Sequence, residues 1–202
     1  MRLWFFYMGK EIYIRDATSE DAPFIARVVL AGIEMLDMDT ALPDNQRDLY
    51  EHLVGICRMD DTLYSYRNTR IAEIDGCAVG ALVAYDGARY AKMREKTFGL
   101  VKQTSSMDLS HNAMETGPGE FYLDSMAILS DYRGVGIGKK LMHDRIDFAL
   151  SNGFQKVTLL VDKDKPRLQR YYESMGFAFS DEMFVFGSWY RKLVFSYGEL
   201  TK

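Results

Sequence analysis

The stretch "SDYRGVGIGKKLMHD", residues 130–144, places three glycines at alternate positions directly before a helix-like run. Glycine has no Cβ, so Gly134, Gly136 and Gly138 allow a ligand to approach backbone N–H groups closely. Apolar residues then recur at helical spacing, which predicts a helix ending near Gly153. Free N–H groups at a helix start, together with the helix dipole, attract phosphate groups. The stretch therefore predicts a pyrophosphate site, and the alternative is a helix entrance that binds nothing.

Two well-known phosphate loops do not fit this stretch. A P-loop requires glycine where Arg133 stands and Ser or Thr where Lys140 stands. A dinucleotide fingerprint beginning at Gly134 requires a third glycine where Lys139 stands, and its glycines should follow the preceding strand almost at once. Asp162, at the end of the next predicted strand, is the one residue that supports the fingerprint. A nicotinamide-dependent oxidoreductase is therefore the weaker alternative.

The apolar pattern along the rest of the chain predicts alternating strands and helices. The dipeptide Asp75-Gly76 between two apolar runs is a strong signal for an antiparallel hairpin. The segment 104–119 carries no periodicity and predicts a long loop. The predicted strands are 10–15, 70–74, 78–85, 120–128, 156–162, 177–186 and 189–197, and the predicted helices are the run after Thr18-Ser19, 44–58, 88–103, the run after the glycines and 166–175. These elements predict an α/β fold with a mixed sheet and one parallel crossover near its middle.

Composition sets limits on partners and location. The chain has 202 residues, enough for one domain, and its net charge of -4 leaves no large basic face, so nucleic acid is not expected as a partner. The two cysteines form no C-x-x-C pair and the three histidines lack ligand spacing, so no metal site is expected. No stretch is long enough to span a membrane. The short apolar segment 1–9 lacks a cleavage site and is interpreted as a tail or an added strand. We therefore expect a soluble, cytoplasmic protein with no membrane partner.

Two stretches, "SMAILSDYRGVGIGKKLM" at 125–142 and "LLVDKDKPRLQRYYESMGF" at 159–177, together resemble the GNAT superfamily of N-acetyltransferases. The acetyl-coenzyme A loop of that family reads Q/R-x-x-G-x-G/A, and Arg133, Gly136 and Gly138 fill it. The order of the predicted elements, including "IRDATSEDA" near the start of the chain, agrees with the family as well.

The resemblance implies how the chain is organised. It implies a GNAT-like central mixed sheet, mostly antiparallel, of about seven strands flanked by helices, with the parallel crossover at the cofactor site. Residues 1–202 should form a single domain, in which 120–177 is the acetyl-CoA-binding core. Residues 88–119 are expected to be an insertion, or excursion, on the acceptor side.

The resemblance also implies positions that bind the co-substrate acetyl-CoA. Backbone amides of the glycine loop should hold the pyrophosphate, with Arg133 beside it. The end of the preceding strand should pair its backbone with the pantetheine arm. The expected cofactor-binding residues are Met126, Ala127, Ile128, Arg133, Gly134, Val135, Gly136, Ile137, Gly138 and Lys139. One departure from the family is Lys165-Pro166-Arg167-Leu168, which stands where an N-x-x-A motif often contacts the cofactor.

Tyr172 stands where the family places a tyrosine that reprotonates the departing thiolate. Its spacing with Leu168, Tyr171 and Met175 is also that of a core aromatic on a helix, so a purely structural role is the alternative. Tyr171 is the second candidate for the proton donor.

A primary amine near pKa 10.4 is almost entirely protonated at neutral pH, so a base must remove a proton before attack. Asp124 is a carboxylate inside the apolar strand "EFYLDSMAI", where burial without a partner would be costly. Two-residue alternation places Glu120 on the same face of the strand, which makes it the second candidate. The alternative for each is a solvent-facing carboxylate on a half-exposed strand.

The predicted function is acetyl-CoA-dependent N-acetyl transfer to a primary amine of a small molecule or peptide, by direct attack through a tetrahedral intermediate. The acidic segment 34–61 favours a cationic acceptor, and the alternative for most of its acidic residues is a solvated acidic helix. A catalytically silent coenzyme A-binding regulatory domain is the alternative. A second copy of the chain, forming a homodimer, is an optional further partner.

Overall fold

The computed structural model describes residues 11–105 and 108–196, so the apolar segment 1–9 lies outside the described residues. The strands are β1 (Tyr13–Asp16), β2 (Thr69–Ile74), β3 (Cys77–Asp86), β4 (Glu120–Ile128), β5 (Lys156–Asp162), β6 (Ala178–Val185) and β7 (Ser188–Ser196). The α-helices are α1 (Ala22–Gly32), α2 (Arg47–Cys57), α3 (Tyr90–Thr104), α4 (Ile137–Ser151) and α5 (Pro166–Glu173). Each predicted strand and helix has a counterpart among the described residues, and β4 and β5 have the predicted bounds. β1 begins at Tyr13, later than predicted, and α5 ends at Glu173, two residues earlier than predicted.

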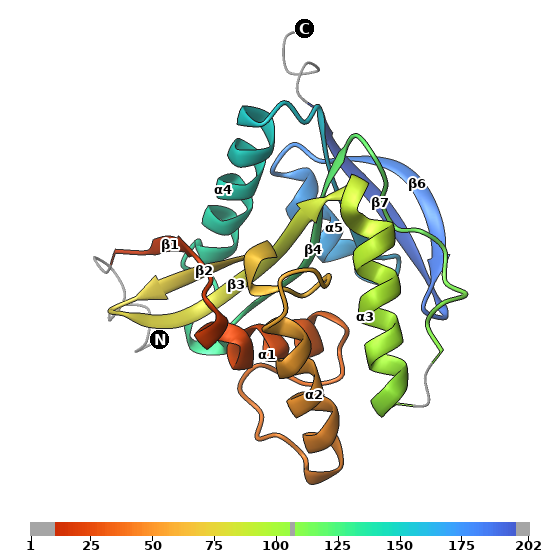
Figure 1. Cartoon of the computed structure of the whole chain (residues 1–202). Helices are drawn as coiled ribbons and strands as arrows, with labels where there is room; N and C mark the ends of the chain where they lie inside the picture. Colours follow the sequence, from red (N-terminus) through yellow and green to blue (C-terminus); the bar gives the residue numbers. More distant parts are fainter. Residues whose placement is uncertain (1–10, 106–107, 197–202) are drawn as a thin grey trace, which may run out of the picture. The chain divides into compact units, whose positions relative to one another are not determined.

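The seven strands form a sheet in the order β1-β2-β3-β4-β5-β7-β6 (Figure 1). The β4/β5 pair is parallel, whereas the β1/β2, β2/β3, β5/β7 and β6/β7 pairs are antiparallel. Helix α4 connects the two parallel strands, as the crossover requires. The predicted fold class, a mostly antiparallel mixed sheet with one parallel crossover, is confirmed.

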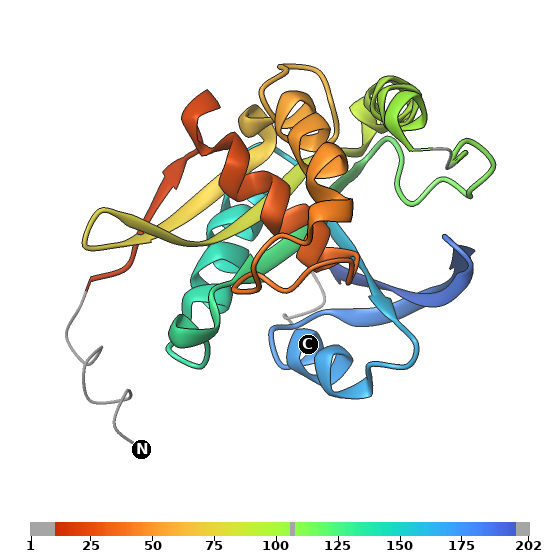
Figure 2. The same cartoon turned by 90° about the horizontal axis from the view of Figure 1, so that it is seen from below.

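The described residues divide into two compact units, one made of 11–83 with 125–144 and the other of 84–105 and 108–124 with 145–196. In the first unit, α1 packs against α2, and the two helices lie side by side in Figure 2. Ile25, Val28 and Val29 of α1 are almost completely buried, because their spacing places them on one helix face. The β2–β3 hairpin turns at Asp75 and Gly76, which have φ values of 52° and 75°. This is the turn that the sequence predicted.

In the second unit, β5 pairs with β7 along its whole length, from Lys156↔Ser196 to Asp162↔Tyr190. Helix α5 begins at Pro166, whose fixed φ suits a first helical turn. The helix ends before Gly176, which has a φ of 93° and so adopts the left-handed conformation common after helices. Phe177 then returns to the buried core and fixes the end of the helix that carries Tyr172.

Candidate functional site

The glycine loop lies in the first unit, between a 3-10 turn at Ser130–Tyr132 and the start of α4. Gly134 and Gly136 have φ values of 80° and 93°, in the left-handed region that favours glycine. A Cβ built on either glycine would meet no atom within 4 Å, so both lie at an open surface. The backbone amides of this turn can therefore be approached from outside without obstruction by side chains.

Helix α4 is held firmly at its first turn. Ile137 and Leu141 are 1% and 0% exposed and anchor the helix in the core. The first N–H groups of any helix have no acceptor within the helix, so those at the start of α4 are available to an anion. Lys139 is exposed beside them, whereas Gly138 is buried in the turn. An open glycine cradle, a helix start and a nearby cation together fit a diphosphate group.

The side chain of Arg133 makes two interactions with the protein, a hydrogen bond and an ion pair. Its Nε donates to the carbonyl of Ile128 at 3.0 Å, and its guanidinium lies 3.3 Å from Asp37 Oδ1. Asp39 accepts a hydrogen bond from the backbone N–H of Ser130 at 2.9 Å. The connection between α1 and α2 thus holds the glycine loop in place through two carboxylates. Arg133 remains half exposed and faces solvent with part of its guanidinium.

The backbone that was predicted to bind pantetheine lies at the end of β4. The parallel ladder between β4 and β5 runs from Glu120↔Lys156 only to Leu123↔Leu159. Met126, Ala127 and Ile128 follow after the last of these pairs. Close contact with β3 supports these three residues, because a Cβ on Gly80 would lie 3.0 Å from Ile128 and 3.2 Å from the carbonyl of Ala127.

Tyr172 lies on α5 in the second unit, with its ring centroid 5.6 Å from that of Tyr171 and 6.2 Å from that of Phe177. Burial, and to a smaller degree the neighbouring Tyr171, raises the pKa of Tyr172 to about 12. The phenol is therefore protonated at neutral pH, as a proton donor must be. The Tyr172 ring contacts the buried Phe177, but Tyr172 itself is only partly buried and is not one of the core residues.

Asp124 belongs to a group of three tyrosines and two carboxylates in the second unit, which we call the carboxylate–tyrosine cluster. Its members are Tyr85, Tyr90, Glu115, Tyr122 and Asp124. Tyr85 donates a hydrogen bond of 2.5 Å to Asp124 Oδ2. Tyr90 and Tyr122 donate bonds of 2.7 Å to the two carboxylate oxygens of Glu115. The three tyrosine rings contact one another, with centroids 5.8 to 6.5 Å apart.

The pKa of Glu115 lies above that of an ordinary carboxyl group. Burial and the nearby negative charge of Asp124 raise the pKa of Glu115 to about 7, although the hydrogen bonds from Tyr90 and Tyr122 oppose the shift. Burial raises the pKa values of Tyr85 and Tyr122 well above that of a free phenol, so both remain donors. The sequence did not identify Glu115, because it lies in the loop 105–119, where no periodicity predicts which way a side chain points.

Glu120, the second candidate base, has a different environment. Its Oε2 lies 2.7 Å from Lys192 Nζ and accepts hydrogen bonds from Thr116 at 2.8 Å and Thr158 at 3.3 Å. Burial alone would raise the pKa of Glu120, but the bonds from Lys192 and Thr116 lower it below its ordinary value. Glu120 is thus an ion-paired carboxylate that holds its proton weakly.

Several acidic residues of the segment 34–61 bond to the protein itself. In addition to Asp37 and Asp39, Asp44 pairs with Arg47 at 3.1 Å and Asp60 pairs with Arg67 at 2.9 Å. These pairings reduce the negative charge that the segment can offer to a cationic acceptor. Among the described residues, no group of three or more His, Cys, Asp or Glu side chains could hold a metal ion.

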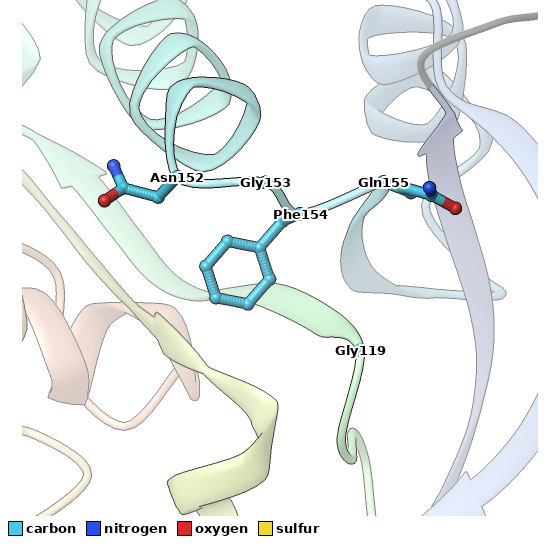
Figure 3. A pocket seen from close by; sticks show the side chains of 5 residues that line it. All are labelled: Gly119, Asn152, Gly153, Phe154 and Gln155. Carbon is cyan, nitrogen blue, oxygen red and sulfur yellow. The ribbon is translucent and has the colours of Figure 1, made fainter.

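A pocket of about 330 Å³ lies in the second unit at the connection between α4 and β5. Figure 3 shows the ring of Phe154 projecting from this connection, with the side chains of Asn152 and Gln155 pointing to opposite sides. The Phe154 ring packs 5.3 Å from that of Phe121. Gly119 and Gly153 complete the lining, which contains no titratable side chain, so the pocket offers no group for acid–base chemistry.

In the described part of the chain, no helix is long and apolar enough to cross a membrane.

Comparisons with known proteins agree with this geometry. The model of the acetyltransferase (GNAT) family matches residues 33–177. A curated relative from Schizosaccharomyces pombe, N-alpha-acetyltransferase 30, is 34% identical over 56 residues, which are 28% of this chain and 37% of that protein. The match therefore spans well under half of the curated relative.

Solved structures match over far more of the chain. An acetyltransferase crystal structure has a TM-score of 0.73 and 28% identity, covering 91% of this chain and 98% of that one. An N-acetyltransferase from Staphylococcus aureus Mu50 has a TM-score of 0.72 at 23% identity, covering 90% and 99% of the two chains, and shares the fold. Because the family model covers more than half of the sequence and the glycine loop lies within it, this chain belongs to the GNAT family of acetyltransferases.

Proposed function

We propose that the protein transfers the acetyl group of acetyl-CoA to a primary amine of a small molecule or peptide. The observation that carries the proposal is the glycine loop, where two left-handed glycines open to solvent directly before the buried first turn of α4. The family of the chain supports acetyl transfer in general. The name of the fission yeast relative, an N-alpha-acetyltransferase, supports an amine as the acceptor.

In this proposal the first unit binds the co-substrate. The amides from Gly134 to Lys139 and the side chain of Arg133 bind the pyrophosphate, because both offer N–H donors to an anion. The backbone of Met126–Ile128 binds the pantetheine arm, since these residues follow the end of the β4–β5 ladder. Thiol release from acetyl-CoA then depends on residues of the second unit. We propose that both units act together as one transferase domain covering residues 1–202.

Two side chains of the second unit move protons. Tyr172 gives a proton to the departing sulfur, which its raised pKa allows at neutral pH. A carboxylate takes the proton that the attacking amine must lose. Between the two candidates on β4, Asp124 is preferred to Glu120, because Glu120 is ion-paired with Lys192 and its lowered pKa makes it a weak proton acceptor.

Calorimetric titration with acetyl-CoA and with NADH tests the co-substrate. We expect acetyl-CoA to bind and NADH not to bind, and tight binding of NADH alone would refute the proposal. An acetylation screen that detects free coenzyme A thiol then tests the acceptor across polyamines, amino acids, aminoglycosides, arylamines and lysine peptides. Thiol release with at least one amine supports the enzyme, whereas binding of acetyl-CoA without release for any of them supports the silent regulatory domain.

A further inference from the structure

The carboxylate–tyrosine cluster consists of a buried aromatic layer and two carboxylates that are more accessible. Tyr85, Tyr90 and Tyr122 are 2%, 0% and 2% exposed, whereas Glu115 and Asp124 are only partly buried. The tyrosines therefore form a dry layer behind two carboxylates that retain contact with the surface. All three phenol protons point to carboxylate oxygens, so each carboxylate is fixed in place by at least one short hydrogen bond.

The negative charge of Glu115 has no cation bonded to it. Among the described residues, no lysine or arginine nitrogen lies within the 4.0 Å of an ion pair with its carboxylate. Lys192 bonds to the backbone carbonyl of Glu115 at 3.1 Å and pairs with Glu120 instead. The guanidinium of Arg94 donates to the carbonyls of Leu109, Ser110 and Asn112 and lies 4.9 Å from the centroid of the Phe98 ring. Its positive charge lowers the pKa of Glu115 without forming an ion pair with it.

Asp124 lies at the end of the parallel ladder between β4 and β5. The last pair of the parallel ladder is Leu123↔Leu159, so Asp124 is the first residue of β4 beyond it. Because successive strand residues point to opposite faces, Tyr122 and Asp124 share one face of β4. Glu115, in the loop before β4, accepts a hydrogen bond from the hydroxyl of Tyr122. The two carboxylates thus meet the same aromatic layer at the end of the β4–β5 ladder.

We propose that Glu115 and Asp124 together bind the ammonium group of the acceptor, and that Glu115 receives its proton. Two carboxylates near each other without a bonded cation on Glu115 favour a positively charged guest, and the aromatic layer behind them excludes competing water. The acceptor class that this pair selects is a primary aliphatic amine, which arrives as a cation. This inference rests on the proposed acetyl transfer and refines it: Glu115 takes the role of proton acceptor in place of Asp124, and Asp124 contributes negative charge to the ammonium site.

The proton and bond changes balance. The ammonium nitrogen gives one proton to the Glu115 carboxylate and becomes a neutral amine. Its lone pair forms the C–N bond to the acetyl carbonyl carbon, and the C–S bond breaks. Tyr172 gives a proton to the thiolate, and the phenolate regains a proton from the attacking nitrogen. Glu115 then releases its proton to solvent, so the products are the acetamide, coenzyme A thiol and one proton.

The groups that face Glu115 bear on its titration. They come from β3 (Tyr85), α3 (Tyr90 and Arg94), β4 (Tyr122 and Asp124) and β7 (Tyr190 and Lys192). The phenols remain neutral over the working range, because burial raises their pKa values. Asp124 is the neighbouring carboxylate whose negative charge raises the pKa of Glu115.

Carbon-13 NMR of the side-chain carboxyls in the full chain tests the pair directly. We expect Glu115 to titrate near neutral pH, and its midpoint to fall in Asp124→Asn because the like charge is gone. Addition of n-butylammonium should also lower the midpoint, and n-butanol should not. A midpoint of Glu115 in the ordinary carboxyl range, or the same response to both probes, would overturn the proposal.

Kinetics with the best amine from the acceptor screen gives the second test. In Glu115→Gln we expect kcat/KM to fall by about 10²-fold and its pH inflection near neutrality to disappear. The matched control is Asp108→Asn, which removes an exposed carboxylate from the same segment and should keep the wild-type profile. A wild-type pH profile in Glu115→Gln would overturn the proposal. The affinity of the wild type and of Glu115→Gln for acetyl-CoA is measured in parallel. If the wild type does not bind acetyl-CoA, the proposed acetyl transfer itself is refuted. If both proteins bind acetyl-CoA normally, a wild-type pH profile in Glu115→Gln refutes only the role of Glu115.

Discussion

The hydroxyl of Tyr122 donates a hydrogen bond to Oε2 of Glu115 across 2.7 Å. This bond fixes the end of a long, irregular loop onto the central strand β4, seven residues later in the chain. It also brings a carboxylate into surroundings where its charged form is disfavoured. The relationship therefore connects the stability of the protein with pH through one side chain.

Glu115→Gln should change how stability depends on pH. Burial raises the pKa of Glu115 to about 7 from 4.5, so the folded state binds a proton that the unfolded state lacks in this interval. The stabilisation is fully present below pH 4.5 and is lost as pH rises through about 7. At pH 8 we expect Glu115→Gln to be more stable than the wild type by on the order of 2 kcal/mol, with little difference at pH 5.

Urea denaturation at pH 5 and pH 8 measures this difference. Asp108→Asn serves as the control, because bonds from Lys102 and Ser110 lower the pKa of Asp108 and its ionisation does not change between these pH values. Equal stability of Glu115→Gln and wild type at both pH values would contradict the buried, proton-binding state of Glu115.

Lys192→Met should destabilise the second unit. The Lys192 and Glu120 side chains are only 14% and 20% exposed, so loss of the cation leaves a largely buried carboxylate without its partner. We expect a loss of about 2–3 kcal/mol at pH 7. Because the pKa of Glu120 is lowered, its contribution is present above its unfolded pKa and is lost as pH falls through the folded one. The effect should therefore shrink towards pH 3.

A double variant, Lys192→Met with Glu120→Gln, tests the cause of that loss. If the unpaired charge is responsible, the double variant should recover part of the stability in urea denaturation at pH 7. Strictly additive losses from the two single substitutions would show that the ion pair contributes nothing.

Gly136→Val should weaken acetyl-CoA binding by about 10-fold or more, equivalent to about 1.4 kcal/mol. A β-branched side chain is strained at the φ of 93° and obstructs the open side of the loop. The matched control is Gly76→Val, which introduces the same residue at a φ of 75° in the β2–β3 turn, also with open space around it. Calorimetry should give a near-normal dissociation constant for the control, and equal losses in both variants would refute the loop's role.

Tyr172→Phe should lower kcat by about 10²-fold while the dissociation constant of acetyl-CoA stays near that of the wild type. The substitution removes the proton donor but keeps the ring that packs against Phe177. Steady-state kinetics of Tyr171→Phe gives the comparison, since the two rings are neighbours. A loss of turnover in Tyr171→Phe alone would assign the proton donor to the adjacent tyrosine.

Local chemistry in the sequence was enough to predict the fold class and the position of the glycine loop. The bounds of β4 and β5 could be predicted because each strand is a short apolar run between turn residues. The glycine loop could be predicted from the sequence because only glycine adopts the left-handed conformation of Gly134 and Gly136 without strain. These signals depend on residues within a few positions of each other, which is why a single sequence contains them.

The tertiary structure alone decided which carboxylate meets which partner. Asp124 and Glu120 have the same alternation on β4, yet one bonds to Tyr85 and the other to Lys192, which are 39 and 72 positions away in the chain. Glu115 lies in a loop without periodicity, and only the packing of Tyr90 and Tyr122 around it reveals its raised pKa. Burial and charge arise from segments that are distant in sequence, so no local pattern can encode them.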